Sequence, residues 1–163
     1  MNQPADAAGG MPDIYVDADA CPVKEETLRV AERHGLVTYM VSDGGIRPNP
    51  DPKVRIVVVP QGPDAADDWI AENIRAGDIA VTSDIPLADR CLKKGAGAIR
   101  PDGRAFTENS IGAAMATREL MAGLREMGEV TGGPPPFSKR DRSQFLQTLE
   151  TAIQKTKKAL RNI

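Results

Sequence analysis

The sequence predicts a three-layer α/β fold, in which a mainly parallel β-sheet is flanked by helices and followed by a C-terminal helical extension. Short apolar runs alternate with longer segments whose apolar residues recur at helical spacing, the pattern of a sheet built from strand and helix units. The run from Ile56 to Val59 is apolar at every position, which is typical of a strand buried on both faces. The 163 residues suffice for one domain with extensions.

Composition and cysteine usage limit the classes of protein that the chain could belong to. It is 40% hydrophobic and 27% charged, which is typical of a soluble protein. No apolar run approaches the roughly 20 residues that span a bilayer, and the first twelve residues lack the features of an export signal. Cys21 and Cys91 lie far apart, so neither a zinc knuckle nor a disulfide framework is indicated. We expect a cytoplasmic protein without membrane contact, and the oligomeric state stays open.

The first half of the chain begins with a leader and a strand. Residues 1–12 are rich in Ala, Gly, Asn and Pro, and we expect them to be disordered. A β-prone run at 14–16 leads into two aspartates, and Pro22 then stands where a helix could begin. The elements predicted after it are a helix at 23–34, a strand at 36–41, a loop at 42–52, a strand at 54–59 and a helix at 65–75.

The second half continues the alternation. A short strand is predicted at 79–82, and the helix after it should have Asp84 near its cap and Pro86 at its first position. A last parallel strand is expected at 96–99, with 104–106 as a possible extension. Thr107 is expected to cap a long helix at 108–127.

A Pro-rich linker and a basic helix are predicted to occupy residues 132–163 and to pack on an α/β domain formed by residues 13–131. Ser138 and Asp141 have the spacing of a capping box. The apolar side of this helix should consist of Phe145, Leu146, Leu149, Ile153 and Leu160. Residues 139–163 carry a formal charge of +5, so the rest of the chain carries −7 within the total of −2. This polarity suits metal binding by the body and polyanion binding by the helix, although a solvated helix face explains it as well.

Several aspartates are expected at one edge of the sheet. Asp17 and Asp19 follow the first strand, and Asp84 follows the strand at 79–82. In a parallel sheet the carboxyl ends of the strands share an edge, and ligands gather where the strand order reverses. On the helix at 65–75, steps of about 100° per residue place Asp67 toward this edge and Asp68 toward water. One aspartate of the first pair could instead merely cap the helix that follows.

Carboxylates that crowd together raise one another's pKa, and a divalent cation relieves this repulsion. Oxygen ligands without histidine favour Mg²⁺ or Mn²⁺. The candidate ligands are Asp17, Asp19, Asp67, Asp68 and Asp84, and the candidate catalytic residues are Asp17, Asp67 and Asp84. Such a site suits phosphodiester hydrolysis. Hydroxyl groups and cations that could contact a phosphate or a nucleic-acid backbone are those of Thr82, Ser83, Lys139 and Arg140.

Four segments, "IYVDADACPVKEE", "ADDWIAE", "VTSDIPLADRCL" and "GGPPPFSKRDR", occur in this order. With them the chain closely resembles the YaiI/YqxD family of bacterial proteins over about residues 14 to 150. That family is grouped with the PIN-like superfamily, whose active members are Mg²⁺- or Mn²⁺-dependent nucleases. The resemblance implies a PIN-like domain and a nucleic-acid partner, RNA more than DNA. It maps the acids of the PIN pattern onto Asp17, onto Asp84 and onto Asp67 or Asp68.

Two alternatives to a nuclease remain open at this stage. Asp17 and Asp19 have the spacing of the nucleophile and the general acid in haloacid-dehalogenase-like phosphatases, although no clear lysine and terminal acidic pair follow in the expected order. The second alternative is a non-catalytic PIN-like module that binds nucleic acid or protein through its basic helix.

Overall fold

The computed structural model describes residues 11–128 and 136–161 of the chain, the latter range without the side chains of its last two residues. Residues 1–10 of the leader predicted at 1–12, residues 132–135 of the predicted linker and the side chain of Leu160 therefore lie outside the described residues. Met11 and Pro12, which the leader was predicted to include, pack on the body of the protein.

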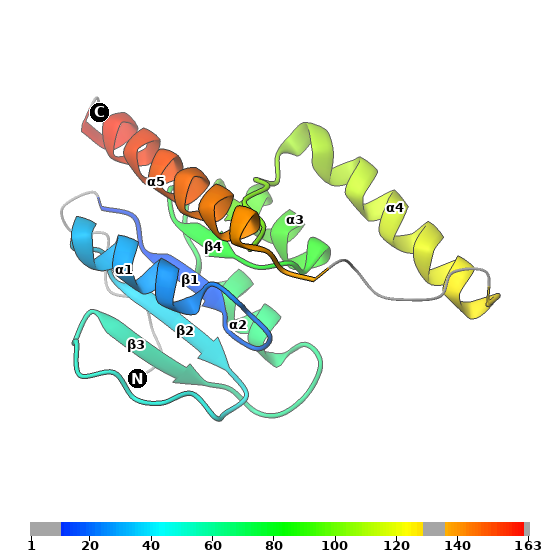
Figure 1. The fold of residues 1–163 in the computed structure, drawn as a ribbon, viewed down its shortest axis with the longest axis horizontal. Helices are drawn as coiled ribbons and strands as arrows, with labels where there is room; N and C mark the ends of the chain where they lie inside the picture. Colours follow the sequence, from blue (N-terminus) through cyan, green and yellow to red (C-terminus); the bar gives the residue numbers. More distant parts are fainter. Residues whose placement is uncertain (1–10, 129–135, 162–163) are drawn as a thin grey trace.

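The described residues form a five-stranded parallel sheet with helices on both faces (Figure 1). Its strands are β1 (Ile14–Asp17), β2 (Thr38–Ser42), β3 (Val54–Val58), β4 (Ile79–Val81) and β5 (Gly97–Ile99). The helices are α1 (Lys24–His34), α2 (Ala65–Asn73), α3 (Ile85–Lys93), α4 (Glu108–Glu126) and α5 (Lys139–Arg161). The strand order is β3-β2-β1-β4-β5, with every neighbouring pair parallel. The predicted three-layer α/β fold with a C-terminal helix is confirmed.

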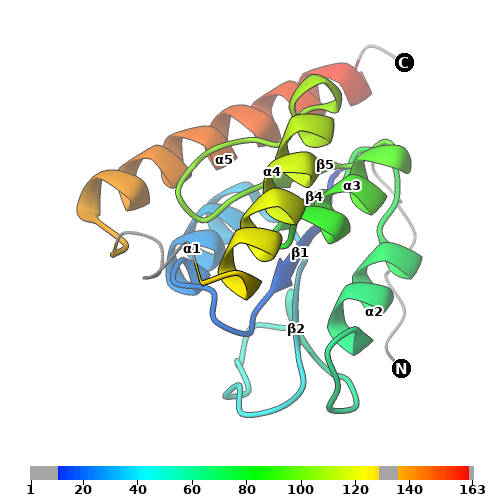
Figure 2. The same cartoon turned by 90° about the vertical axis from the view of Figure 1, so that its right-hand side faces the viewer.

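Two apolar clusters fill the space between the layers. On one face α2 and α3 pack on the sheet around Tyr15 and Tyr39, whose rings stack at 4.8 Å between centroids. On the other face α1 and α5 bury Phe145, Leu149 and Ile153 against the sheet. Figure 2 shows the sheet edge-on between these helix layers. Alternating side chains of one strand point to opposite faces, so β1 contributes to both clusters and holds the centre of the fold.

The order of the strands places β1 at the point where the chain changes direction. From β1 the chain moves to β2 and β3 on one side, and it then returns to β4 and β5 on the other side. Ile14, Tyr15 and Val16 pair with the three residues of β4. The crevice beyond the carboxyl ends of two such strands is the usual ligand site of an open parallel sheet.

The region after β5 differs from the sequence-based expectation. Residues 104–106 do not extend a parallel strand, because the chain turns back at 100–104 and Ala105 makes a single antiparallel bridge to Ile99. The backbone N–H of Arg100 donates to the carbonyl oxygen of Arg104 at 2.8 Å, which closes the turn. The Thr148 hydroxyl of α5 donates to the carbonyl oxygen of Gly103 at 2.7 Å. The turn is therefore held by α5.

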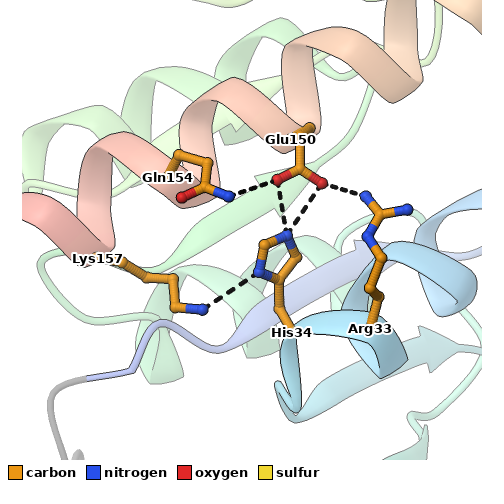
Figure 3. Close-up of polar contacts among 5 residues, drawn as sticks. All are labelled: Arg33, His34, Glu150, Gln154 and Lys157. Carbon is orange, nitrogen blue, oxygen red and sulfur yellow. Dashed lines mark hydrogen bonds and ion pairs between the residues drawn. The ribbon is translucent and has the colours of Figure 1, made fainter.

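Helix α5 is also fixed along α1 by a polar cluster (Figure 3). The carboxylate of Glu150 accepts hydrogen bonds from Arg33 and from Gln154, and its Oε2 lies 2.8 Å from Nε2 of His34. Lys157 approaches the other ring nitrogen of His34 at 3.2 Å. The hydrogen bond to His34, together with those to Gln154 and Arg33, holds the pKa of Glu150 at about 2. His34 thus has a structural place in the contact between the two helices.

Helix α4 projects from the body (Figure 1). Ile111 is the buried residue of this helix, whereas Leu120 and the C-cap residue Met127 are 62% and 70% exposed. Among the described residues no helix is both long enough and apolar enough to cross a bilayer.

We predict that Gly103→Ala destabilises the protein by roughly 2–4 kcal/mol. Gly103 has a φ of +92°, and a Cβ there would come within 2.6 Å of the carbonyl carbon of Gln144 in α5. The control is Gly112→Ala in α4, where a Cβ meets nothing within 4 Å, so we expect a neutral or slightly stabilising effect. Urea unfolding measures both. Equal stability of the Gly103 variant and the wild type would show that the turn does not pack on α5 as described.

A second prediction concerns Glu150→Gln. Because the folded pKa of Glu150 is lowered to about 2, its charge adds stability that is full above the unfolded pKa of about 4.5 and is lost as the pH falls toward 2. We expect the variant to melt below the wild type at pH 7, and the difference in Tm to shrink between pH 4.5 and pH 2. A difference in Tm that stays constant over this range would contradict the prediction.

Candidate functional site

The centre of the candidate site is a hydrogen-bonded chain that joins the ends of β1 and β4. The buried hydroxyl of Thr82 donates to Oδ2 of Asp17 at 2.9 Å and accepts the backbone N–H of Asp84 at 3.0 Å. Oδ1 of Asp84 accepts the N–H of Leu87 at 2.8 Å and caps α3, as the sequence predicted. Thr82 therefore fixes the Asp17 carboxylate beside the start of α3, and two segments 65 residues apart in the sequence meet.

Asp67 reaches the same place from the first turn of α2. Burial, followed by the charges of Asp84, Asp17, Asp64 and Asp68, raises the pKa of Asp67 to about 7. Its helix-mate Asp68 is exposed and forms an ion pair with Arg90 at 2.7 Å. This agrees with the helical spacing, which directs Asp67 toward the sheet edge and Asp68 toward water.

Burial also raises the pKa of Asp17, and the charges of Asp84 and Asp19 act in the same direction, while the hydrogen bond from Thr82 lowers it. The charges that raise the pKa of Asp17 and Asp67 are those of other carboxylates, while Arg90, which pairs with Asp68, also interacts with Asp67. At the opposite edge of the sheet, burial and the charge of Asp78 raise the pKa of Asp13 to about 6, although Arg75 and Arg55 act in the lowering direction. Within the described part of the chain, Asp17, Asp67 and Asp84 therefore form an acidic cluster in which burial and neighbouring carboxylates outweigh the cation near Asp67.

The remaining predicted ligand, Asp19, is held to the end of β2. Its Oδ1 accepts the Ser42 hydroxyl at 2.7 Å, and its Oδ2 accepts the backbone N–H of Asp43 at 3.3 Å. Asp19 borders the cluster and contributes charge to it. The structure thus brings Asp17, Asp67 and Asp84 together, with Asp19 beside them and Asp68 directed away.

The oxygen-only donor set of the cluster fits a hard divalent cation such as Mg²⁺ or Mn²⁺. Two further observations bear on this fit. Burial and the repulsion of neighbouring carboxylates favour protonation of Asp17 and Asp67, a cost that a cation would remove. On the other hand, no three His, Cys, Asp or Glu side chains of the described residues are arranged as a metal-ligand group. Asp17, Asp67 and Asp84 are the side chains that would hold such a cation.

The candidate phosphate contacts lie around this edge in different ways. Thr82 is buried and engaged with Asp17, so it positions the cluster. Ser83 is exposed and lines a pocket of about 390 Å³, to which Phe137 and Asp141 at the start of α5 also contribute. Lys139 and Arg140 are exposed in the first turn of α5. In the sequence they lie between Phe137 and Asp141, which line this pocket.

Sequence analysis missed two residues of that pocket, Arg100 and Arg104. The signal is visible once the register is known. Val81 pairs with Ile99, and the Thr82 N–H donates to the Ile99 carbonyl oxygen at 3.1 Å. Arg100 therefore directly follows the end of β5, which lies beside the end of β4 and so beside the acidic cluster.

Fold and site together define an α/β protein with an acidic site beyond the carboxyl edge of a parallel sheet, at its switch point. The family model described as "Uncharacterized BCR, YaiI/YqxD family" matches residues 15–155. The chain belongs to this family. It is similar to a UPF0178 protein of Parvibaculum lavamentivorans, with 60% identity over 88% of this chain and 95% of that protein.

Further relatives agree with this assignment. A UPF0178 protein of Rhodospirillum rubrum is 58% identical over 90% of this chain and 98% of its own length. One of Paramagnetospirillum magneticum is 55% identical, with 92% and 99% covered. No solved structure matches the chain.

The acidic cluster leads to a prediction on pH and stability. Because the folded pKa of Asp67 is raised to about 7, its ionisation opposes folding, and stability falls as the pH rises from the unfolded pKa of about 4 through 7. We expect Asp67→Asn to raise Tm at pH 8 and to leave it nearly unchanged below pH 4. The comparison is Asp68→Asn, which loses the exposed ion pair with Arg90 and should change Tm little. A gain in Tm for Asp67→Asn that is equal at pH 4 and pH 8 would show that the pKa of Asp67 is not raised by burial and by the neighbouring carboxylates.

Proposed function

We propose that the protein is a metal-dependent nuclease, which hydrolyses phosphodiester bonds of nucleic acid, RNA in particular, at the acidic cluster. The observation that carries the proposal is the meeting of Asp17, Asp67 and Asp84 at the switch point, where burial and neighbouring carboxylates raise the pKa of Asp17 and of Asp67. Resemblance to the PIN-like superfamily points the same way. Asp17, Asp67 and Asp84 would hold Mg²⁺ or Mn²⁺. When bound, the cation supplies Lewis acidity toward a phosphoryl oxygen.

The residues of this chain would have distinct tasks in the reaction. Thr82 holds Oδ2 of Asp17 in place through its hydroxyl. Asp84 sits at the N-terminus of α3, where the helix dipole favours its negative charge. The exposed hydroxyl of Ser83 is available to a phosphate oxygen. Attack by water forms a new P–O bond and breaks the P–O ester bond. The proton that the water loses passes to a carboxylate or to solvent, and the leaving oxygen takes up a proton from solvent.

The two alternatives can be weighed on specific contacts. A haloacid-dehalogenase-like phosphatase would need Asp19 as a general acid, whereas both oxygens of Asp19 accept hydrogen bonds from the end of β2 and the residue after it. A non-catalytic nucleic-acid-binding module is favoured by the lack of a ready metal-ligand group among the described residues. A phosphoaspartate trapped on Asp17 would support the phosphatase.

We predict Mn²⁺-dependent cleavage of a single-stranded RNA by the wild type. The variant Asp17→Asn/Asp84→Asn should cleave the RNA at least roughly 100-fold more slowly, because loss of two direct ligands should cost more than loss of a group that only supports a ligand. The same variant should still bind RNA in EDTA. Mn²⁺ should raise Tm of the wild type but not of the double variant. Asp68→Asn is the matched control and should retain both properties.

The result can also turn against the nuclease. Absence of cleavage by the wild type, together with loss of RNA binding in Lys139→Met/Arg140→Met, would leave the non-catalytic module. Turnover of phosphomonoesters without diesters would favour the phosphatase.

A further inference from the structure

The pocket beside Ser83 contains two arginines whose donors are not used up within the protein. Arg100 and Arg104 stand at the two ends of the turn after β5, and both line the pocket of about 390 Å³. Their Nε atoms each lie 3.8 Å from Oδ2 of Asp102, which is longer than a hydrogen bond. One carboxylate therefore faces two guanidinium groups. Among the described residues, no other side-chain ion pair is formed by either of them.

Other cations near this edge of the sheet are engaged differently. Arg142 donates to Glu26 at 2.7 Å and to the carbonyl oxygen of Pro22 at 2.9 Å, and Arg90 pairs with Asp68. These groups already have partners at hydrogen-bond distance. Arg100 and Arg104, with side chains 39% and 78% exposed, keep their N–H donors available, and a guanidinium fork matches the oxygens of a phosphate.

The pocket also has an aromatic wall. Phe137 lines it, and the guanidinium carbon of Arg142 lies 4.9 Å from the centroid of its ring. Arg142 thus lies over the ring, and the ring also packs against the core cluster, so its position in the wall of the pocket is fixed. A flat apolar ring beside a pair of guanidinium groups suits a nucleotide, because a base can stack on the ring while its phosphate reaches the arginines.

The position of this pocket relative to the acidic cluster is fixed by the backbone. Ser83, which lines it, lies between Thr82 and Asp84 in the sequence. Arg100 follows β5 directly, next to the end of β4. A nucleic-acid strand bound in the pocket would therefore continue past Ser83 to the carboxylates. The contacts of Gly103 with α5 make the orientation of the turn depend on α5.

We infer that the pocket formed by Ser83, Arg100, Arg104 and Phe137 binds one nucleotide of a single-stranded nucleic acid, with the phosphate on the two arginines and the base on Phe137. The inference rests on the proposed function, since it places the nucleotide next to the one that is cleaved. Duplexes fit poorly because their bases are already stacked. Asp102 would keep the two guanidinium groups close together, and phosphate would displace it as their partner.

Binding is measured by fluorescence anisotropy with a labelled single-stranded RNA of about ten nucleotides, in EDTA, so that no cleavage is required. We expect Arg100→Met/Arg104→Met to weaken binding roughly tenfold. The slope of log K against log salt should fall by about 0.7 for each phosphate that the variant no longer neutralises. The matched control, Lys53→Met/Lys93→Met, removes two charges before β3 and in the last turn of α3, at the opposite edge of the sheet, and should keep affinity within about twofold.

A second variant tests the aromatic wall. Phe137→Leu keeps an apolar side chain against the core but removes the flat ring, and it should weaken single-strand binding roughly fivefold, with an unchanged salt slope. A duplex of the same length should bind less tightly than the single strand. A free mononucleotide, added at the same concentration of nucleotides, should not displace the single strand from the protein. Circular dichroism melts confirm that each variant is folded.

Unchanged affinity and slope in the arginine variant overturn the inference, and so does full displacement by the mononucleotide. These outcomes are separate from the failure of the nuclease proposal. If the wild type binds RNA through the arginines but never cleaves it with Mn²⁺, the nucleotide-binding inference is supported and the nuclease proposal is wrong. If the wild type cleaves RNA, and the arginine variant cleaves and binds RNA equally well, the nuclease proposal is supported and the nucleotide-binding inference is wrong.

Discussion

The parallel pairing of β1 with β4 is the constraint on which the candidate site depends. It forces the chain to reverse direction across the sheet, and it sets the last residue of β1 next to the segment that enters α3. Thr82 converts this proximity into a fixed geometry, since its single hydroxyl serves Asp17 and the backbone of Asp84 together. The carboxylates crowd at a place where burial disfavours their charge, and the fold accepts this cost where a ligand would bind.

Helix α5 links the structural and the functional parts of the molecule. Its apolar face completes the second core cluster, and Glu150 ties it to α1 through His34 and Arg33. Its first turns border the pocket, and it also holds the turn that carries Arg100 and Arg104. The basic helix therefore matters in two ways, because it could meet a polyanion itself and because it holds the turn whose two arginines line the pocket.

Much of this arrangement could be predicted from the sequence. The alternation of strands and helices, the caps at Asp84 and Thr107, and the orientation of Asp67 follow from local periodicity and from hydrogen-bonding chemistry. The meeting of Asp17 and Asp84 followed from topology. The turn at 100–104 could not be foreseen, because its reversal depends on a close approach of Gly103 to Gln144 in α5, which is remote in the sequence. The exposure of α4 was equally invisible, since apolar residues at helical spacing do not reveal whether anything covers them.

The most direct test of the central claim is a crystal of the protein soaked in Mn²⁺ and measured at a wavelength where manganese scatters anomalously. The account predicts an anomalous peak within the cluster, in contact with carboxylate oxygens of Asp17 and Asp84 and with Asp67 turned toward it. A fully soaked crystal whose only peaks lie elsewhere on the surface would contradict it.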